Sequence, residues 1–381
     1  MYNNELSQEQ NMILRSVKDI ARGKVKSRAG EVDELAQYPQ DIWDVLKEAD
    51  IFSMFFPEEY GGTNLDYHTC CLVIEELAKV DTNTSMMPLT QDLGALPILM
   101  SNNEELKKKY IPDIASGDCH VSFAATEPEA GSDLGAISTN AILKGNKYIL
   151  NGVKHYISYA DIADILTVYA KTNSEAGSEG LSCFLVEKNT PGLIIGKKEK
   201  KMSVRGAQAC EVIFKDCQVQ KENLISGEGQ AVKNLMNLLN FTRPLVGACA
   251  VGLAQGALDY ALQYASGRVQ FGRPICKFQG IQFMLADMAM EIEAARYLVY
   301  YAASQVEKRS SDIPKFSAMA KCFASDVAMK VTVNAVQILG GAGLMCDHPV
   351  ERMMRDAKQL QIVEGTNQVL RVVIANQLLS R

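Results

Sequence analysis

The chain has 381 residues, of which 47% are hydrophobic and 22% are charged, and its net charge is −6. This ordinary globular composition argues against a basic nucleic-acid-binding surface spread over the whole chain. The ten cysteines lack the paired spacing of zinc sites, so we expect no metal centre and reduced thiols rather than disulfides.

Residues 1–118 are predicted to form a helical domain. Ser7 and Gln10 make a capping box, and apolar residues follow at helical spacing. Further helices are expected from Pro39, over Tyr67–Val80 and from Glu104 to Tyr110, the last ending before Pro112.

Residues 119–227 change to short β-rich runs separated by turns. The runs are Val121–Ala125, Lys147–Asn151, Ile165–Lys171, Ser182–Val186, Leu193–Ile195 and Glu211–Phe214. Several short strands at this spacing predict a domain of the β-barrel or sandwich type.

Residues 228–381 read as helices again, over Val232–Tyr264, Phe278–Glu307, Lys315–Leu339 and a shorter stretch after Thr366. Antiparallel packing into a bundle is the natural way to bury helices of this length. Because no βαβ units alternate along the chain, we predict an α+β fold and not a doubly wound sheet.

The common nucleotide and hydrolase motifs are missing from the sequence. There is no phosphate loop, no G-x-G-x-x-G after a strand, no G-x-S-x-G elbow and no H-E-x-x-H. A nicotinamide enzyme or a nucleotide hydrolase of the usual kinds is therefore disfavoured.

Four segments could carry chemistry. Phe123–Asp133 ends a strand in a turn rich in backbone N–H groups and hydroxyls, which suits a flat ring and a pyrophosphate or is a plain turn. Arg268–Ile275 offers arginines to phosphate or to a helix dipole. Gln337–Gly343 permits close backbone approach or a helix cap. Glu364 precedes Thr366, an expected N-cap, and taken alone reads as a surface carboxylate.

Together, in this order, these segments resemble the acyl-CoA dehydrogenase family over essentially the whole chain. Phe123–Asp133 is similar to its T-E-P-x-A-G-S-D signature, Arg268–Gly272 to R-x-x-F-G, Gln337–Gly341 to Q-x-x-G-G, and Glu364–Thr366 to E-G-T. Thr242–Pro244 and Glu58–Gly62 match family positions too. The resemblance implies an N-terminal helical domain, a middle β-domain and a C-terminal four-helix bundle.

The resemblance also implies FAD as cofactor, an acyl-CoA substrate, electron-transferring flavoprotein as partner, and a homotetramer. Glu364 would be the catalytic base. The cofactor-binding residues would be Phe123, Ala125, Thr126, Gly131, Ser132, Tyr156, Ile157, Ser158, Arg268, Gln270, Phe271, Gln279, Gln337, Gly340, Gly341 and Thr366, with Arg268, Phe271, Gln337 and Gly341 serving the FAD of a neighbouring subunit. The substrate-binding residues would be Ser132, Asn240, Arg243, Val363, Gly365 and Asp92.

The implied chemistry removes a weakly acidic α-proton beside a thioester. A carboxylate in a water-poor pocket is a stronger base toward that proton, because desolvation disfavours its charge. In the family, the backbone N–H at the position of Glu364 and a ribityl hydroxyl stabilise the enolate oxygen, and the β-hydrogen leaves as hydride to FAD.

The chain departs from the family pattern at several positions. Val363 replaces a frequent aromatic residue and frees volume, which hints at a branched, cyclic or substituted acyl group. Asn240 stands where aspartate is frequent, Tyr156 stands at the flavin wall, and Asp92 is either a polar pocket residue or a solvated helix residue.

Other functions stay open at this point. An enoyl-CoA reductase would use the same site in reverse, an oxidase would usually be longer, and a non-catalytic flavoprotein scaffold would not need Glu364. The N-terminus shows no targeting segment and no uncharged apolar run reaches membrane-spanning length, so a cytoplasmic enzyme without membrane contact is expected.

Overall fold

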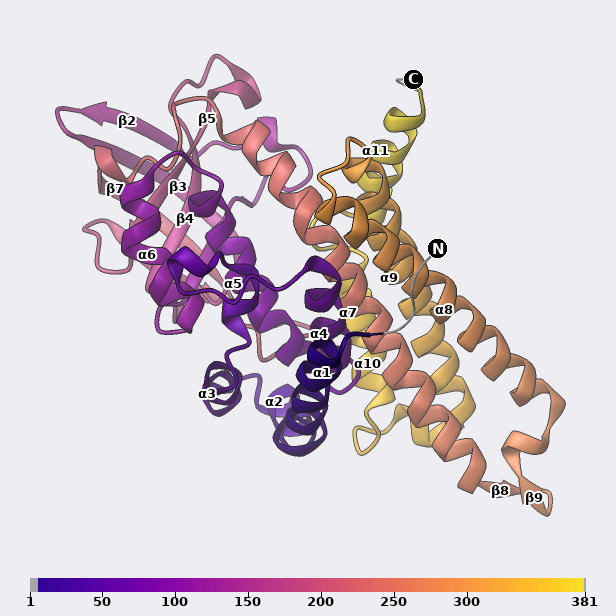
Figure 1. Cartoon of the computed structure of the whole chain (residues 1–381). Helices are drawn as coiled ribbons and strands as arrows, with labels where there is room; N and C mark the ends of the chain where they lie inside the picture. The colour runs from indigo at the N-terminus through magenta and orange to yellow at the C-terminus, as the bar shows by residue number, and fades with distance from the viewer. Residues whose placement is uncertain (1–5, 380–381) are drawn as a thin grey trace.

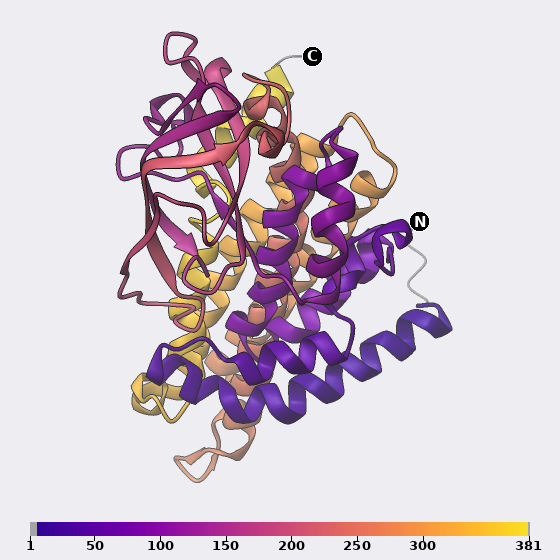
Figure 2. The ribbon, with the colours of Figure 1, turned by 90° about the vertical axis from the view of Figure 1, so that its left-hand side faces the viewer.

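Helices form both ends of the chain and a sheet forms its middle (Figure 1), which confirms the predicted α+β class. The computed structural model describes residues 6–379. Figure 2 shows the N-terminal helices in front of the C-terminal helices, with the sheet to one side.

The N-terminal helices are α1 (Gln8–Ile20), α2 (Lys26–Leu35), α3 (Gln40–Glu48), α4 (Tyr67–Ala78), α5 (Thr82–Leu99) and α6 (Glu104–Ser116). The predicted capping box is confirmed, because Ser7 Oγ accepts from the Gln10 N–H while Gln10 Oε1 accepts from the Ser7 N–H, each at 3.0 Å. A π-helical segment, Ala21–Val25, joins α1 to α2, and neither α2 nor α5 was expected.

The predicted end of α6 before Pro112 is wrong, because the helix continues to Ser116. Proline leaves the carbonyl four residues earlier without its helical donor. That residue is Lys108, which is exposed, so water can satisfy its carbonyl group. Ile111 and Ile114, on either side of the proline, are fully buried and hold the helix against its neighbours.

The seven-stranded sheet runs in the order β1-β4-β2-β3-β7-β6, with β5 beside β4. Its strands are β1 (Val121–Ala124), β2 (Asn140–Lys144), β3 (Lys147–Ser158), β4 (Ile165–Lys171), β5 (Leu181–Glu187), β6 (Leu193–Lys198) and β7 (Ala209–Gln220). The pairs β1–β4 and β2–β4 are parallel and the other pairs are antiparallel. All six predicted strands are present, and β2 is an addition.

The C-terminal bundle consists of α7 (Ala231–Gly267), α8 (Gln279–Glu307), α9 (Ile313–Leu339), α10 (Val350–Leu360) and α11 (Asn367–Leu379). A small hairpin, β8 (Val269–Gln270) and β9 (Arg273–Pro274), lies at one end of the bundle, and α11 lies at the other (Figure 1).

The bundle contacts the N-terminal domain through a close approach of α7 to α4. A Cβ atom at Gly252 would lie 2.2 Å from the Glu75 carbonyl oxygen, and one at Gly256 would lie 2.0 Å from that of Lys79. Glycine is therefore required at both positions, and this contact fixes α7 beside α4.

Two helical stretches, Ala231–Gly267 and Ile313–Leu344, are long and apolar enough to cross a membrane by length and composition alone. In the first, 78% of the apolar window is buried inside the protein. The core helices of a bundle have the same composition, so this is weak evidence for a membrane span.

Candidate active site

Four parts of the chain meet around the Glu364 side chain. Tyr67 comes from α4, Asp92 from α5 and Thr242 from α7, while Glu364 itself lies in the turn between α10 and α11. The electrostatic fields of Asp92 and Glu364 act on the Tyr67 hydroxyl, and that of Glu364 acts on Asp92, so these groups share one region. The Tyr67 hydroxyl donates to the Phe241 carbonyl oxygen.

Glu364 is held by its neighbours on α7. The Thr242 Oγ1 donates to Glu364 Oε2 at 2.5 Å. Arg243 is buried, and its Nε donates to the Glu364 carbonyl oxygen at 3.3 Å while its Nη1 donates to Asn240 Oδ1 at 3.0 Å. The sequence-predicted residues Glu364, Arg243 and Asn240 are thus brought together.

Burial raises the pKa of Glu364, and the Thr242 hydrogen bond and the charges of Arg243 and Lys321 oppose that rise. Glu364 is half-buried as a whole residue, while its carboxyl group is desolvated. A desolvated carboxylate has the properties of a general base.

Asp92 is buried with an exposed fraction of 4%. Burial and, next, the charge of Glu364 hold the pKa of its carboxyl well above the usual range. Among residues 6–379, no side chain or backbone group is assigned a hydrogen bond to it. Burial therefore excludes the solvated helix residue, and the polar pocket residue stays a prediction.

Val363 packs on the apolar core and Thr366 caps α11, as predicted, because its Oγ1 accepts from the Val369 N–H at 3.3 Å. The sequence reading missed two neighbours of Glu364. In the sequence Thr242 stands out only as part of Thr242–Pro244. Lys321 of α9 belongs to no motif, and it donates to the Gly365 carbonyl oxygen at 2.8 Å. A lysine among the small residues Ala318, Ala320 and Ala324 was the available signal.

The signature segment after β1 rests on a buried ion pair. Lys154 Nζ lies 2.8 Å from Glu127 Oε1 and donates to the Ala125 carbonyl oxygen at 2.9 Å. Burial alone would raise the pKa of Glu127, but the charge of Lys154 and hydrogen bonds from residues 138 and 139 outweigh it and lower the pKa to about 2. The pair fixes the backbone on either side of Thr126.

The predicted flavin-side residues of the β-domain fall into three groups by burial. Ala125 and Ile157 are buried, Phe123, Thr126 and Ser158 are half-buried, and Gly131, Ser132 and Tyr156 are exposed. Tyr156 has a left-handed backbone, φ 61°, and its ring stacks on His155 with centroids 4.0 Å apart. This conformation presents the tyrosine ring to solvent at the end of β3.

The remaining predicted cofactor residues lie at the β8–β9 end of the bundle, away from α11 (Figure 1). Arg268, Gln270, Phe271, Gly340 and Gly341 line one cavity of about 610 Å³. Gln279 and Gln337 are exposed and lie close to these residues in the sequence. They do not line this cavity.

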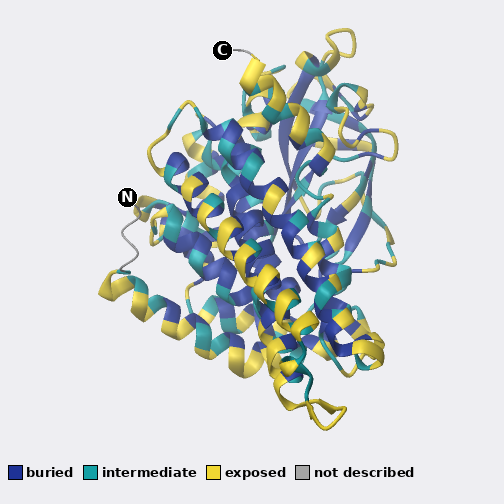
Figure 3. Ribbon diagram, turned by 90° about the vertical axis from the view of Figure 1, so that its right-hand side faces the viewer, coloured by how far each residue is buried: buried dark blue, intermediate teal, exposed yellow. Residues whose placement is uncertain are grey.

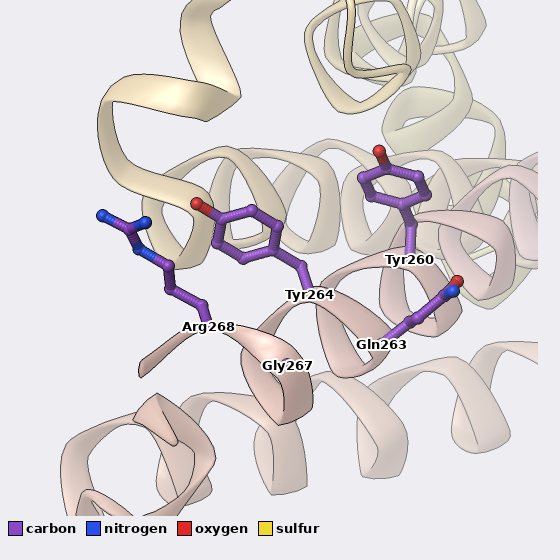
Figure 4. Close-up of a pocket in the computed structure, with 5 residues that line it drawn as sticks. All are labelled: Tyr260, Gln263, Tyr264, Gly267 and Arg268. Carbon is purple, nitrogen blue, oxygen red and sulfur yellow. The ribbon is translucent and has the colours of Figure 1, made fainter. Parts of the chain in front are cut away.

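An adjoining cavity of about 400 Å³ also uses Arg268, and Figure 4 shows Tyr260, Tyr264 and Arg268 projecting from the same side of α7. No role for the two tyrosines is predicted from the sequence. Tyr260, Tyr264 and Arg268 follow one another at intervals of four residues, which places all three on one helix face.

These surfaces fit the expected FAD. A Cβ atom at Gly131, Gly340 or Gly341 would meet nothing within 4 Å, so the backbone there is open to a ligand. The Arg268 guanidinium suits a pyrophosphate, and the Phe271 ring, 93% exposed, suits a base or ring system. Among the described residues, no group of three or more His, Cys, Asp or Glu side chains could hold a metal ion.

Comparisons with known proteins identify the family of the chain. Models of the N-terminal, middle and C-terminal domains of acyl-CoA dehydrogenase match residues 7–118, 122–217 and 229–379. Cyclohex-1-ene-1-carbonyl-CoA dehydrogenase of Syntrophus aciditrophicus is 45% identical over 377 residues, which are 99% of this chain and 91% of the relative.

Two solved structures share the fold over nearly the full length. A chain from the structure of the electron-transferring flavoprotein of Acidaminococcus fermentans has a TM-score of 0.97 at 46% identity, with 100% of both chains covered. The FAD complex of PigA has a TM-score of 0.92 at 30% identity, with 99% of both chains covered.

Proposed function

Because the chain belongs to the acyl-CoA dehydrogenase family, we propose that it oxidises a ring-containing or otherwise substituted acyl-CoA to the 2,3-enoyl-CoA with Glu364 as the base. The chain is an oxidoreductase acting on CH–CH bonds, and its cofactor is FAD. The observation that carries the proposal is the desolvated Glu364 carboxylate, which is held by a hydrogen bond from Thr242.

The residues of this chain do the acid–base part of the reaction. Glu364 takes the α-proton, and its carboxyl group holds that proton while the double bond forms. The Glu364 N–H is the donor we assign to the thioester oxygen, where negative charge develops. Bound FAD would supply the acceptor for the β-hydride. The flavin half of FAD would be held by residues 123–132, 156–158 and 366. The Arg268 cavity would hold the adenine half of the FAD that is bound by a neighbouring subunit.

Thr242 tunes the base, and its loss has a predictable sign. The T242V substitution removes a donor that favours the ionised carboxyl, so the pKa of Glu364 rises further. The acidic limb of the kcat/KM profile should move to higher pH, because activity requires the ionised form. T242S keeps the hydroxyl and should keep the wild-type limb. Superimposable profiles for T242V and wild type would show that the contact does not matter.

The acyl group is proposed from the pocket residues and from one relative. Val363 is smaller than the aromatic residue frequent at this position in the family, and Asp92 places a polar group in the region of Glu364. The Syntrophus relative is a cyclohex-1-ene-1-carbonyl-CoA dehydrogenase, which supports a six-membered ring. A panel of straight, branched and ring thioesters tests this, with reduction of an artificial electron acceptor as the readout. Ring thioesters should give the highest kcat/KM, and a preference for straight chains would refute this part of the proposal.

Substitution of Asp92 should raise stability and lower substrate selectivity, which is the combination expected for a residue that binds substrate. D92L removes a buried, unpaired carboxyl, so the protein should become more stable by about 1–3 kcal/mol. The same change should lower kcat/KM for the preferred thioester by roughly 10- to 200-fold relative to butyryl-CoA. Thermal unfolding and the thioester panel measure the two effects. Lower stability with unchanged selectivity would make Asp92 a structural residue.

Partners and assembly complete the proposal. We propose electron-transferring flavoprotein as electron acceptor, which the 46% identical chain from the Acidaminococcus structure supports. A homotetramer is supported by apolar side chains exposed on the bundle, including Phe283 and Met290, seven residues apart on α8. Figure 3 shows exposed positions along this side of the bundle. We place the enzyme in the cytoplasm, where its ten free thiols would stay reduced.

A further inference from the structure

Lys321 is a fully buried lysine whose hydrogen bonds go to neutral oxygen atoms. It lies in the middle of α9 with no exposed surface, and within residues 6–379 no carboxylate oxygen is paired with its Nζ within 4.0 Å. Its Nζ donates instead to the Gly365 carbonyl oxygen at 2.8 Å and to Asn367 Oδ1 at 3.1 Å. A buried cation is unfavourable unless its interactions compensate for lost hydration, so these two contacts need an explanation.

The first contact falls on the turn that carries the base. Glu364 has φ 54° and Gly365 has φ 97°, so both lie in the left-handed region. This region is unfavourable for a residue with a side chain and persists where the surroundings hold it. Lys321 holds the Gly365 carbonyl group and Arg243 holds the Glu364 carbonyl group, so a cation secures each of the two peptide units.

The second contact ties the same lysine to a rigid network. Asn367 Nδ2 donates to Ser325 Oγ at 2.9 Å and to Asp326 Oδ1 at 2.7 Å. Asp326 Oδ1 also accepts from Gln361 Nε2 at 2.7 Å. Both ends of the turn, at Gln361 and Asn367, are therefore anchored to α9, and Lys321 contacts the stretch between them.

Few charged side chains surround Glu364 and Lys321. Glu364 interacts with six described side chains, of which Arg243 and Lys321 are positive; the others are Thr242, Asp92, Tyr67 and Cys249. Glu364, Cys322, Arg243 and Asp326 face Lys321. Burial lowers the pKa of the Lys321 ammonium to about 8, so the group is largely protonated at neutral pH.

We infer that Lys321 is a positioning residue for the proposed reaction: it holds the Glu364–Gly365 peptide so that the Glu364 carboxylate faces the α-carbon of the thioester. This inference rests on Glu364 being the base. The positive charge of Lys321 also favours the ionised Glu364 carboxylate. Removal of Lys321 should therefore affect both the position and the titration of the base.

The kinetic test compares K321M and K321R with wild type, and with K330M, which removes an exposed lysine of the same helix. The rate of anaerobic flavin reduction is measured at saturating thioester across pH. K321M should lose on the order of 100-fold in kcat with a small change in KM, because a misaimed base affects the chemical step. Its acidic limb should move to higher pH. K321R should recover part of the rate, and K330M should match wild type.

Two outcomes would overturn the inference. One is a K321M enzyme with wild-type kcat and an unshifted limb. The other is a crystal structure of K321M with bound FAD in which Glu364 and Gly365 keep their left-handed backbone and the Gly365 carbonyl group keeps its direction. If K321M does not fold, K321Q, which keeps a shorter polar side chain without charge, is held to the same two criteria.

The structural arm separates this inference from the proposed function. A wild-type protein that no acyl-CoA reduces would refute the function, and the crystal structure would still decide whether Lys321 holds the turn. A reducible wild type with an undisturbed turn in K321M would refute only the inference.

Discussion

E364Q is expected to lose about 10²- to 10⁴-fold in the rate of flavin reduction by its best thioester, which is the usual contribution of a general base. Glutamine has nearly the shape of glutamate and can accept the Thr242 hydrogen bond, but it cannot take a proton at neutral pH. Stopped-flow absorbance of the flavin band measures the rate directly.

The control for E364Q is binding without turnover. Because the Arg268 cavity and the segment after β1 are untouched, the variant should retain FAD at the wild-type stoichiometry. A CoA thioester should still perturb its flavin spectrum. Wild-type rates in E364Q would remove Glu364 from the mechanism and revive the non-catalytic scaffold.

K154M is expected to destabilise the protein by about 3–5 kcal/mol, because it leaves the Glu127 carboxylate buried without its partner. The Ala125 carbonyl group loses its donor at the same time. FAD should therefore dissociate more readily from the segment 123–132. Chemical denaturation and FAD release on dilution measure the two effects.

A matched control for K154M exists on the surface. Lys197, 71% exposed, pairs with Glu199 at 2.9 Å, and K197M should change stability by less than about 1 kcal/mol. The double variant E127L/K154M should recover much of the loss, because no buried charge is left unpaired. Equal effects of K154M and K197M would show that burial of the first pair is not important.

The pH dependence of the wild type follows from the same ion pair. The pKa of Glu127 is lowered from 4.5 to about 2 in the folded protein. Its stabilising contribution is therefore present above about pH 4.5 and is lost as pH falls toward 2.

The three-part architecture can be predicted from the sequence more completely than the individual helices and strands can. Long periodic helices and β-rich runs suffice for the three regions. Helix α5 is not predicted, and it contains Pro88 and Pro97, which usually interrupt a helix. Burial of most of its residues keeps it helical. Strand β2 escapes notice because Ile142 and Leu143 are adjacent, apolar and exposed, which hides the alternation of a strand.

The site divides in the same way. Glu364 and Thr366 could be found because a local motif carries them. Lys321 could not, because its contact with Gly365 joins residues 44 positions apart, and only the packing of α9 against the last turn creates it. For Asp92 the sequence allows a pocket residue or a solvated helix residue, and its burial on α5 excludes the second.

The most direct test of the central claim is the visible spectrum of the purified protein, recorded without oxygen before and after addition of acyl-CoAs. We predict a yellow protein whose flavin band is bleached by a ring or substituted acyl-CoA. A different result would instead establish the reductase: no acyl-CoA bleaches the yellow protein, but an enoyl-CoA reoxidises its flavin after that flavin has been reduced chemically. A protein that binds no flavin, even after incubation with FAD, would contradict the account.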